Sequence, residues 1–120
     1  MNLAVNVERA DKVTIVDLVG ELDAYTSLEV RETVVRLIEE GARDIIINLE
    51  KVDFIDSVGL GTLVGCLKRT AEHGGTISLV CANPQIQKVF DITGLSKIFA
   101  IYPTRDEAIR RVAPATPSSE

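Results

Sequence analysis

Runs of apolar residues along the chain predict four buried or half-buried strands. Two strand-like runs, residues 3–8 and 13–19, are separated by the polar residues 9–12, which are typical of a hairpin turn. Continuous β-branched runs follow at residues 45–49 and 76–80, as expected for strands that are covered on both faces. The chain therefore begins with an antiparallel hairpin and continues with two buried strands.

Helical spacing predicts a helix before each of the two buried strands. Thr26 and Glu29 have the spacing of a capping box, and an apolar face continues to about residue 40, where Gly41 is a suitable left-handed stop. A second helix is predicted over residues 57–73. Because this helix joins the two buried strands, it forms a βαβ unit with them, and they should be parallel.

The last third of the chain predicts two short helices and a final strand. Asn83, followed by a proline, is a helix start, and Gly94 is the matching end. A last strand is expected at residues 97–102. Thr104 and Glu107 repeat the capping-box spacing before a final short helix.

Length and composition fit a single α/β domain. The 120 residues include 46% hydrophobic and 26% charged residues, values that exclude disordered and fibrous classes. The elements together predict an α/β fold with a mixed β-sheet, an N-terminal hairpin and about four helices packed mainly on one side. We expect one domain over residues 1–113 and a disordered tail over residues 114–120.

Charge and cysteine content exclude several classes of function. The net charge of −5 and the absence of Trp disfavour nucleic acid and anionic membranes as partners. No apolar stretch approaches the roughly 20 residues of a membrane span, and no signal peptide is recognisable, so we expect a cytoplasmic protein. Cys66 and Cys81 lack the spacing of a redox or metal motif and are interpreted as small buried residues. No metal or cofactor is expected.

The most informative segment is residues 53–65, where the second helix begins. A helical wheel places an apolar stripe on one side of this helix, formed by Leu60, Leu63, Val64, Leu67 and Ala71. Ser57, Val58, Gly61, Thr62 and Gly65 fall on the other side, together with Lys68, Arg69 and Glu72. Each helical glycine costs about 1 kcal/mol relative to alanine, and an exposed position offers no packing that offsets this. We interpret Gly61 and Gly65 as a surface that a partner approaches closely.

Ser57 lies where an anion is favoured, at the amino terminus of the predicted helix. Free amides and the helix dipole would accommodate a phosphate on its hydroxyl, so Ser57 is a candidate phosphorylation site. The alternative is that Ser57, or Asp56 before it, is simply the N-cap of the helix. The spacing alone leaves both interpretations open.

Enzymatic alternatives find little support. Gly59, Gly61 and Gly65 loosely resemble a dinucleotide fingerprint, but the seven-residue connection from the predicted strand is long and the chain has no room for a cofactor domain. Ser57 as a nucleophile would need His73 as its base, roughly 24 Å away along the same helix. The single histidine and two scattered cysteines do not form a metal-ligand pattern, and Asp53 with Asp56 is more simply interpreted as solvation and capping.

Residues 56–61, DSVGLG, together with residues 20–23, GELD, resemble the STAS domain of bacterial anti-sigma factor antagonists. The resemblance extends from residue 3 to about residue 112. The small size of the chain favours stand-alone antagonists over the STAS modules that are fused to anion transporters.

The resemblance implies a regulatory protein without catalytic activity. Such antagonists bind an anti-sigma factor that is also an ATP-dependent serine kinase, and they thereby release a sigma factor for transcription. Phosphorylation blocks this binding, and a PP2C-type phosphatase restores the active form. By motif position the phosphorylated residue would be Ser57, while Asp23 and Thr26 match a second segment near the partner surface. Val58 departs from the family, whose members commonly have Ser or Thr there.

The predicted partner surface combines both segments. It comprises Asp23, Thr26, Asp56, Ser57, Val58, Gly59, Gly61, Thr62 and Gly65. A phosphate on Ser57 would add about −1.5 to −2 charges beside Asp56 and Asp53, without a change of fold. Two other functions remain open. One is a STAS scaffold subunit that is not switched by phosphorylation, and the other is a small-ligand or nucleotide-binding domain.

Overall fold

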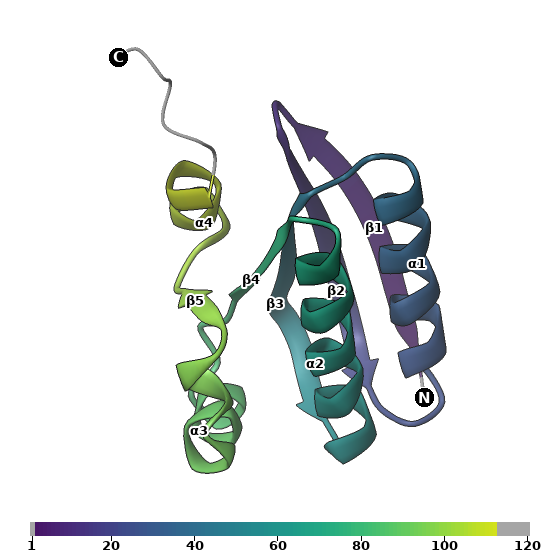
Figure 1. Ribbon diagram of the computed structural model, residues 1–120. Helices are drawn as coiled ribbons and strands as arrows, with labels where there is room; N and C mark the ends of the chain where they lie inside the picture. Colours follow the sequence, from purple (N-terminus) through teal and green to yellow (C-terminus); the bar gives the residue numbers. More distant parts are fainter. Residues whose placement is uncertain (1, 113–120) are drawn as a thin grey trace.

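A five-stranded sheet with helices on both faces forms the molecule, and the computed structural model describes residues 2–112 of it (Figure 1). The strands are β1 (Leu3–Ala10), β2 (Val13–Leu22), β3 (Asp44–Ile55), β4 (Thr76–Val80) and β5 (Ala100–Tyr102). The helices are α1 (Ser27–Glu39), α2 (Ser57–Glu72), α3 (Pro84–Thr93), the 3₁₀ helix η1 (Leu95–Lys97) and α4 (Arg105–Val112). The predicted tail, residues 114–120, lies outside the described residues.

The sheet is mixed, as predicted. Its strand order is β1-β2-β3-β4-β5, with β1 antiparallel to β2 and all later neighbours parallel. The hairpin turn is tighter than predicted, because β1 continues to Ala10 and only residues 11–12 form the turn. β2 continues to Leu22 rather than ending at residue 19. Gly20 permits this extension, because its φ is +128° and an added Cβ would lie 2.2 Å from the Asn2 carbonyl oxygen.

β3 is longer than its apolar run predicts. The strand continues to Ile55, because residues 50–55 still pair with β2 across a register shift, and Val52 and Ile55 are buried while Asp53 is exposed. A search for a continuous β-branched run misses this half-covered portion, whose polar residues face water. The consequence for the functional site is that β3 leads into α2 through a single residue, Asp56.

Three helices cover one face of the sheet and one covers the other, which confirms the prediction of helices mainly on one side. Buried side chains of α1, α2 and α3, including Val34, Leu63 and Phe90, belong to one core with Ile47 of β3. α4 packs on the opposite face, where its Ala108 joins a smaller core formed by Val13, Ile15, Ile46 and Val80. Figure 1 shows α1 and α2 side by side along the sheet.

The helix ends agree only in part with the predicted caps. Asn83 caps α3 by accepting a hydrogen bond from the Gln85 amide, and Gly94 ends the helix in the left-handed conformation. Thr104 caps α4 by accepting from the Glu107 amide at 3.1 Å. The predicted strand at residues 97–102 is shorter, since η1 occupies its first position and β5 begins only at residue 100.

Candidate functional site

The amino terminus of α2 is held by Asp56. One carboxylate oxygen, Oδ1, accepts from the Gly59 amide at 2.8 Å, which is an N-cap bond, and Oδ2 accepts from the Ala24 amide at 3.0 Å. Asp56, and not Ser57, is thus the N-cap of α2. Ser57 is the first residue of the helix, and it is exposed.

The neighbouring turn between β2 and α1 is fixed by Asp23 and Thr26. Asp23 Oδ1 accepts from the amides of Tyr25 and Thr26, and Thr26 Oγ1 accepts from the Asp23 amide and donates to the Glu21 carbonyl. The predicted capping box of Thr26 and Glu29 is wrong, because the Thr26 side chain makes no cap bond. Both side chains are buried, at 4% and 8% exposure, so they shape the turn from within.

Four exposed apolar side chains lie on the segments that lead into α1 and α2, and most of them were not predicted. Tyr25 is 85% exposed, and Leu28, Phe54 and Val58 are each about half exposed. They come from the β2–α1 turn, the start of α1, the end of β3 and the start of α2. The chain has only two Tyr and three Phe, so the position of one of each beside the predicted site was an available signal. Only Val58 had been predicted as part of the partner surface.

The inward side of α2 differs from the predicted stripe at several positions. Leu63 is fully buried, and Leu60, Val64 and Leu67 pack against the core as predicted. Ala71 is exposed, while Thr70 is buried and donates from Oγ1 to the Cys66 carbonyl at 2.7 Å. The buried side of the helix therefore includes Cys66 and Thr70 and lies further from Ala71 than the predicted stripe.

The three glycines of α2 fall into two groups. Gly59 is buried, and a Cβ on it would lie 2.5 Å from the Leu22 carbonyl oxygen, so it permits close packing of α2 on β2. Gly61 and Gly65 are exposed, and nothing lies within 4 Å of the Cβ positions. The contacts of this domain therefore explain Gly59 but neither Gly61 nor Gly65.

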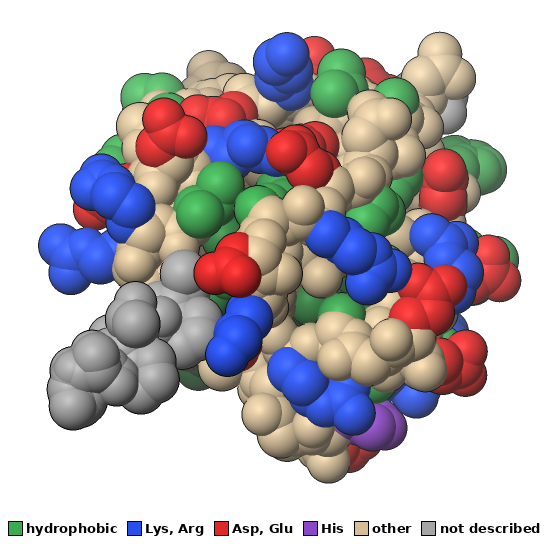
Figure 2. All heavy atoms as spheres, turned by 90° about the horizontal axis from the view of Figure 1, so that it is seen from above, with side chains coloured by type: hydrophobic (Ala, Val, Ile, Leu, Met, Phe, Trp, Pro, Cys, Tyr) green, Lys and Arg blue, Asp and Glu red, His purple; other side chains and the backbone are tan. Residues whose placement is uncertain are grey.

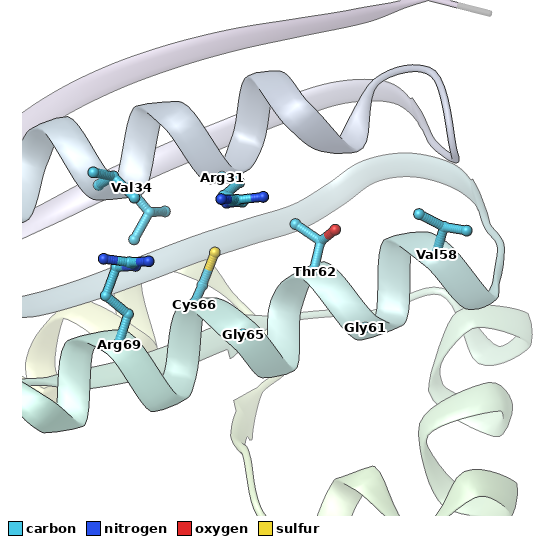
Figure 3. Close-up of a pocket in the computed structure, with 9 residues that line it drawn as sticks. Arg31, Val34, Val58, Gly61, Thr62, Gly65, Cys66 and Arg69 are labelled. Atoms are coloured by element: carbon cyan, nitrogen blue, oxygen red, sulfur yellow. The ribbon is translucent and has the colours of Figure 1, made fainter.

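Gly61 and Gly65 lie in a groove of about 470 Å³ between α1 and α2 (Figure 3). Its lining consists of Arg31, Val34, Val35, Val58, Gly61, Thr62, Gly65, Cys66 and Arg69. Figure 3 shows Arg31 on α1 and Arg69 on α2 reaching toward each other's helix. The groove begins at Val58, directly beside Ser57, so the predicted site and the groove are continuous.

The Cys66 thiol in the groove is protonated at neutral pH. Burial raises its pKa to about 11, and the charges of Arg69 and Arg31 lower it only in part. Cys66 and Cys81 are both buried free thiols, as predicted, and burial raises the pKa of Cys81 as well. Neither thiol has the lowered pKa of a reactive cysteine.

The end of the molecule opposite Ser57 carries acidic and basic side chains in close proximity. Figure 2 shows this end, where His73 ends α2 and acidic and basic side chains lie close together. Arg9 and Glu40 form an ion pair of 2.7 Å there. His73 itself lies against the Arg69 carbonyl, which places the only histidine of the chain at the far end of α2 from Ser57.

The structure corrects one argument against a dinucleotide site. The connection from β3 to α2 is a single residue, and the predicted long approach is wrong. Other observations weigh against phosphate binding: the Gly59 amide is taken by Asp56, and the Leu22 carbonyl fills the space beside Gly59. Residues 2–112 contain no group of three side chains able to hold a metal ion, and no helix among them is long and apolar enough to cross a membrane.

Comparison with known proteins identifies the family. The family model for the STAS domain matches residues 4–108. An "Anti-sigma-B factor antagonist" of Bacillus subtilis is 39% identical over 101 residues, which cover 84% of this chain and 92% of the relative. The crystal structure of an anti-sigma factor antagonist from Mycobacterium paratuberculosis has a TM-score of 0.85 at 29% identity and covers 92% of this chain and 94% of that chain.

A further similar structure is that of a phosphorylated protein. The structure of the Bacillus cell fate determinant SpoIIAA in the phosphorylated form has a TM-score of 0.71 at 32% identity, with 91% of this chain and 99% of that chain covered. These matches run through both halves of the sheet and include β2, β3 and α2. The chain belongs to the STAS domain family.

Proposed function

We propose that this chain is an anti-sigma factor antagonist whose binding to an anti-sigma factor is switched off by phosphorylation of Ser57. The names of its relatives support the antagonist role, and a similar protein has been solved in a phosphorylated form. The partner is an anti-sigma factor that is also a serine kinase, and binding to it releases a sigma factor. The chain is the substrate of this kinase and has no catalytic role of its own.

The observation that carries the proposal is the position of Ser57. It is exposed and is the first residue of α2, while the capping role belongs to Asp56. The cap bond takes the Gly59 amide, which leaves the amides of residues 57 and 58 without an acceptor inside the helix. A kinase can therefore reach the hydroxyl, and a phosphate there meets a helix terminus that favours anions.

The switch consists of a phosphoryl transfer from ATP to Ser57 and the later hydrolysis of the phosphate ester. Ser57 Oγ attacks the γ-phosphorus of ATP held by the kinase, loses its proton and becomes a phosphate monoester, and ADP leaves. A PP2C-type phosphatase then uses water to hydrolyse the ester, which releases inorganic phosphate and regenerates the hydroxyl. The antagonist itself supplies only the hydroxyl and its position.

Phosphorylation opposes binding through charge and bulk on a surface made for close contact. The phosphate adds about −1.5 to −2 charges next to half-exposed Val58, at a surface where docking would remove water. A like-charge contact at 4 Å amounts to about 4 kcal/mol at an effective dielectric constant of 20. A hundredfold loss of affinity needs only about 2.7 kcal/mol. The Asp56 cap remains in place, so we expect the phosphorylated and unphosphorylated proteins to share one fold.

The predicted partner residues divide into two roles in this proposal. Val58, Gly61, Thr62 and Gly65 contact the partner directly, beside Ser57. The other four, Asp23, Thr26, Asp56 and Gly59, hold the β2–α1 turn and the start of α2 in the shape that the partner contacts, because their side chains or backbone are engaged within the domain.

The test is phosphorylation by candidate anti-sigma kinases from the same genome, followed by intact-mass and binding measurements. We expect one added phosphate that is absent in Ser57→Ala and retained in Ser96→Ala, a matched control whose serine lies in η1. Ser57→Ala should bind the kinase permanently, and Ser57→Asp should bind at least about tenfold more weakly. Binding without phosphorylation by any candidate would instead indicate a STAS scaffold that is not switched.

A further inference from the structure

Two arginines without carboxylate partners face the groove between α1 and α2. Arg31 projects from α1 and Arg69 from α2, and neither forms an ion pair within residues 2–112. The residues that line this groove include no Asp or Glu, although the chain as a whole has a net charge of −5. An adjoining hollow shares Arg31 and Arg69 and includes Glu32 and Glu39, but the lining of the groove itself has two positive side chains and no negative one, which is complementary to an acidic partner.

Apart from Thr62, the remaining lining is apolar or consists of glycine. Val34 and Cys66 form the buried floor, and half-exposed Val58 forms one end. On the α2 wall, Gly61 and Gly65 lie one helical turn apart with open space at their Cβ positions. Glycines spaced in this way let the backbone of another helix approach closely.

The length of the groove matches a helix better than a small molecule. Along α2 it extends from Val58 to Arg69, which is about three helical turns or roughly 16 Å. An amphipathic helix that lies in such a groove places apolar side chains on the floor and charged side chains toward the walls. A small organic anion would need only the part between the two arginines, and it would leave the two glycines unexplained.

We infer that the α1–α2 groove receives an acidic amphipathic helix of the anti-sigma factor, with its carboxylates paired to Arg31 and Arg69 and its backbone close to Gly61 and Gly65. This inference rests on the proposed function and specifies the chemistry of the partner. It extends the partner surface to α1, which the sequence analysis had not included.

The same inference accounts for the direction of the switch. Val58 lines the groove and directly follows Ser57, so a phosphate on Ser57 stands at the entrance of the groove. Its negative charge has the same sign as the acidic helix that must enter. Phosphorylation then repels the partner at the place where the arginines attract it.

Charge reversal tests the inference. Arg31→Glu and Arg69→Glu should each weaken binding of the anti-sigma kinase at least about tenfold, as measured by titration calorimetry at fixed ionic strength. Lys68→Glu is the matched control, because Lys68 precedes Arg69 on the same helix, is exposed and does not line the groove. It should change affinity by less than about twofold. Thermal unfolding curves that match the wild type establish that all three variants fold, and Arg31→Gln and Arg69→Gln replace any variant that does not.

Several outcomes would overturn the inference. Equal weakening by all three variants would mean that net charge, not the groove, governs binding. Wild-type affinity in both arginine variants, with Ser57 still phosphorylated, would remove the groove from the interface but leave the proposed function standing. Failure of the wild type to bind any candidate kinase would contradict the proposed function, and the inference with it. Saturable binding of ATP to the antagonist alone, lost in both arginine variants, would assign the groove to a nucleotide.

Discussion

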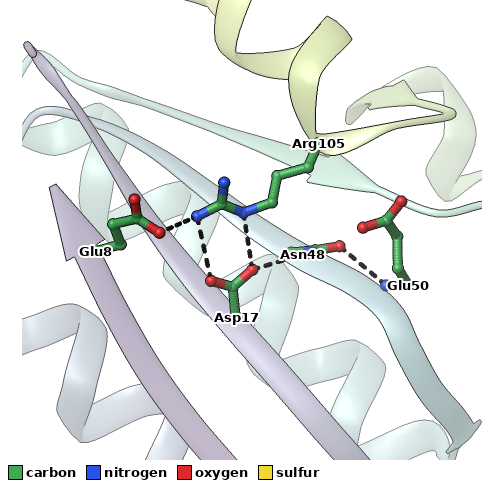
Figure 4. Close-up of polar contacts among 5 residues, drawn as sticks. All are labelled: Glu8, Asp17, Asn48, Glu50 and Arg105. Atoms are coloured by element: carbon green, nitrogen blue, oxygen red, sulfur yellow. Dashed lines mark hydrogen bonds and ion pairs between the residues drawn. The ribbon is translucent and has the colours of Figure 1, made fainter. Parts of the chain in front are cut away.

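Arginines on the two faces of this domain have opposite surroundings. Arg105 of α4 lies on the face of the sheet opposite α1 and α2. Its Nε donates to Asp17 Oδ1 at 3.2 Å, and its Nη2 donates to Glu8 Oε1 (Figure 4). Asn48 donates to the same Asp17 oxygen at 2.8 Å. The hydrogen bond to Asp17, more than the charges around it, raises the pKa of Arg105. Arg31, in the α1–α2 groove, has no such partner among the described residues.

The difference separates an arginine that stabilises the fold from an arginine whose charge is free to bind another molecule. Arg105 connects α4 to β1 and β2, so its charge is paired with carboxylates within the fold. A charge without a partner on a half-apolar groove contributes little to stability, because water solvates it. Its value lies in an interaction with another molecule. The comparison predicts that changes on the sheet side alter stability, whereas changes in the groove alter binding.

The largest expected effect sharpens the comparison within α2 itself. Leu63→Ala should lower the free energy of unfolding by about 2 to 5 kcal/mol, because Leu63 is fully buried in the main core and its truncation leaves a cavity. Thr62→Ala, one residue earlier on the groove side, should stay within about 0.5 kcal/mol of the wild type. Urea unfolding measures both. A comparable loss in Thr62→Ala would show that the groove wall is part of the core.

The next effect compares the arginines directly. Arg105→Gln should lower stability by about 1 to 2 kcal/mol, since it leaves the 26% exposed Asp17 carboxylate with less compensation; the 61% exposed Glu8 adds little. Arg31→Gln should change stability by less than about 0.5 kcal/mol. Urea unfolding at low and moderate salt provides the measurement. Similar losses in the two variants would break the comparison.

The third effect has the opposite sign. Gly61→Ala and Gly65→Ala should each raise the free energy of unfolding by about 0.5 to 1 kcal/mol, because alanine favours the helix and the Cβ meets open space. The same variants should weaken binding of the kinase, because the added methyl groups hold its helix away. Gly74→Ala is the control: its φ of +80° makes alanine unfavourable, so stability should fall. Unchanged binding in both groove variants would contradict the close approach.

The sequence predicted the elements with strong local signals. The runs at residues 45–49 and 76–80, the cap at Asn83 and the end at Gly94 are all found, because each depends on neighbours in the chain. The exposure of Gly61 and Gly65 was also predicted, since the period of a helix fixes which residues share a side.

The predictions that failed depend on contacts between distant segments. Thr26 has the spacing of a capping residue, but Asp23 and the Glu21 carbonyl compete for its hydroxyl once β2 extends to Leu22. Ala71 belongs to the apolar stripe by its angle on the wheel, yet it is exposed, because burial depends on which elements of the fold reach that point of the helix. The groove combines α1 with α2, and nothing in the spacing of either helix indicates that Arg31 and Arg69 meet.

The smallest effect near neutral pH is the pH dependence of stability that the Cys66 thiol contributes. Burial disfavours the thiolate and raises the pKa from 9.0 to about 11. The unfolded chain therefore loses this proton first, and the stability contributed by the buried neutral thiol is complete below pH 9 and is lost as the pH rises to about 11. At pH 7 this contribution is complete and does not vary with pH, so the difference between Cys66→Ala and the wild type should become pH-dependent only above about pH 9.

Arg69→Gln tests whether the groove charge reaches this thiol. Because Arg69 lowers the pKa of Cys66, its loss should raise that pKa further, while stability at pH 7 stays within about 0.5 kcal/mol of the wild type. The thiolate absorbance measured against pH in a Cys81→Ala background reports the shift. Arg110→Gln, on α4, is the control and should leave the titration unchanged. An unchanged pKa of Cys66 in Arg69→Gln would place the guanidinium away from the groove, and with it the positive wall that distinguishes this face from the sheet side.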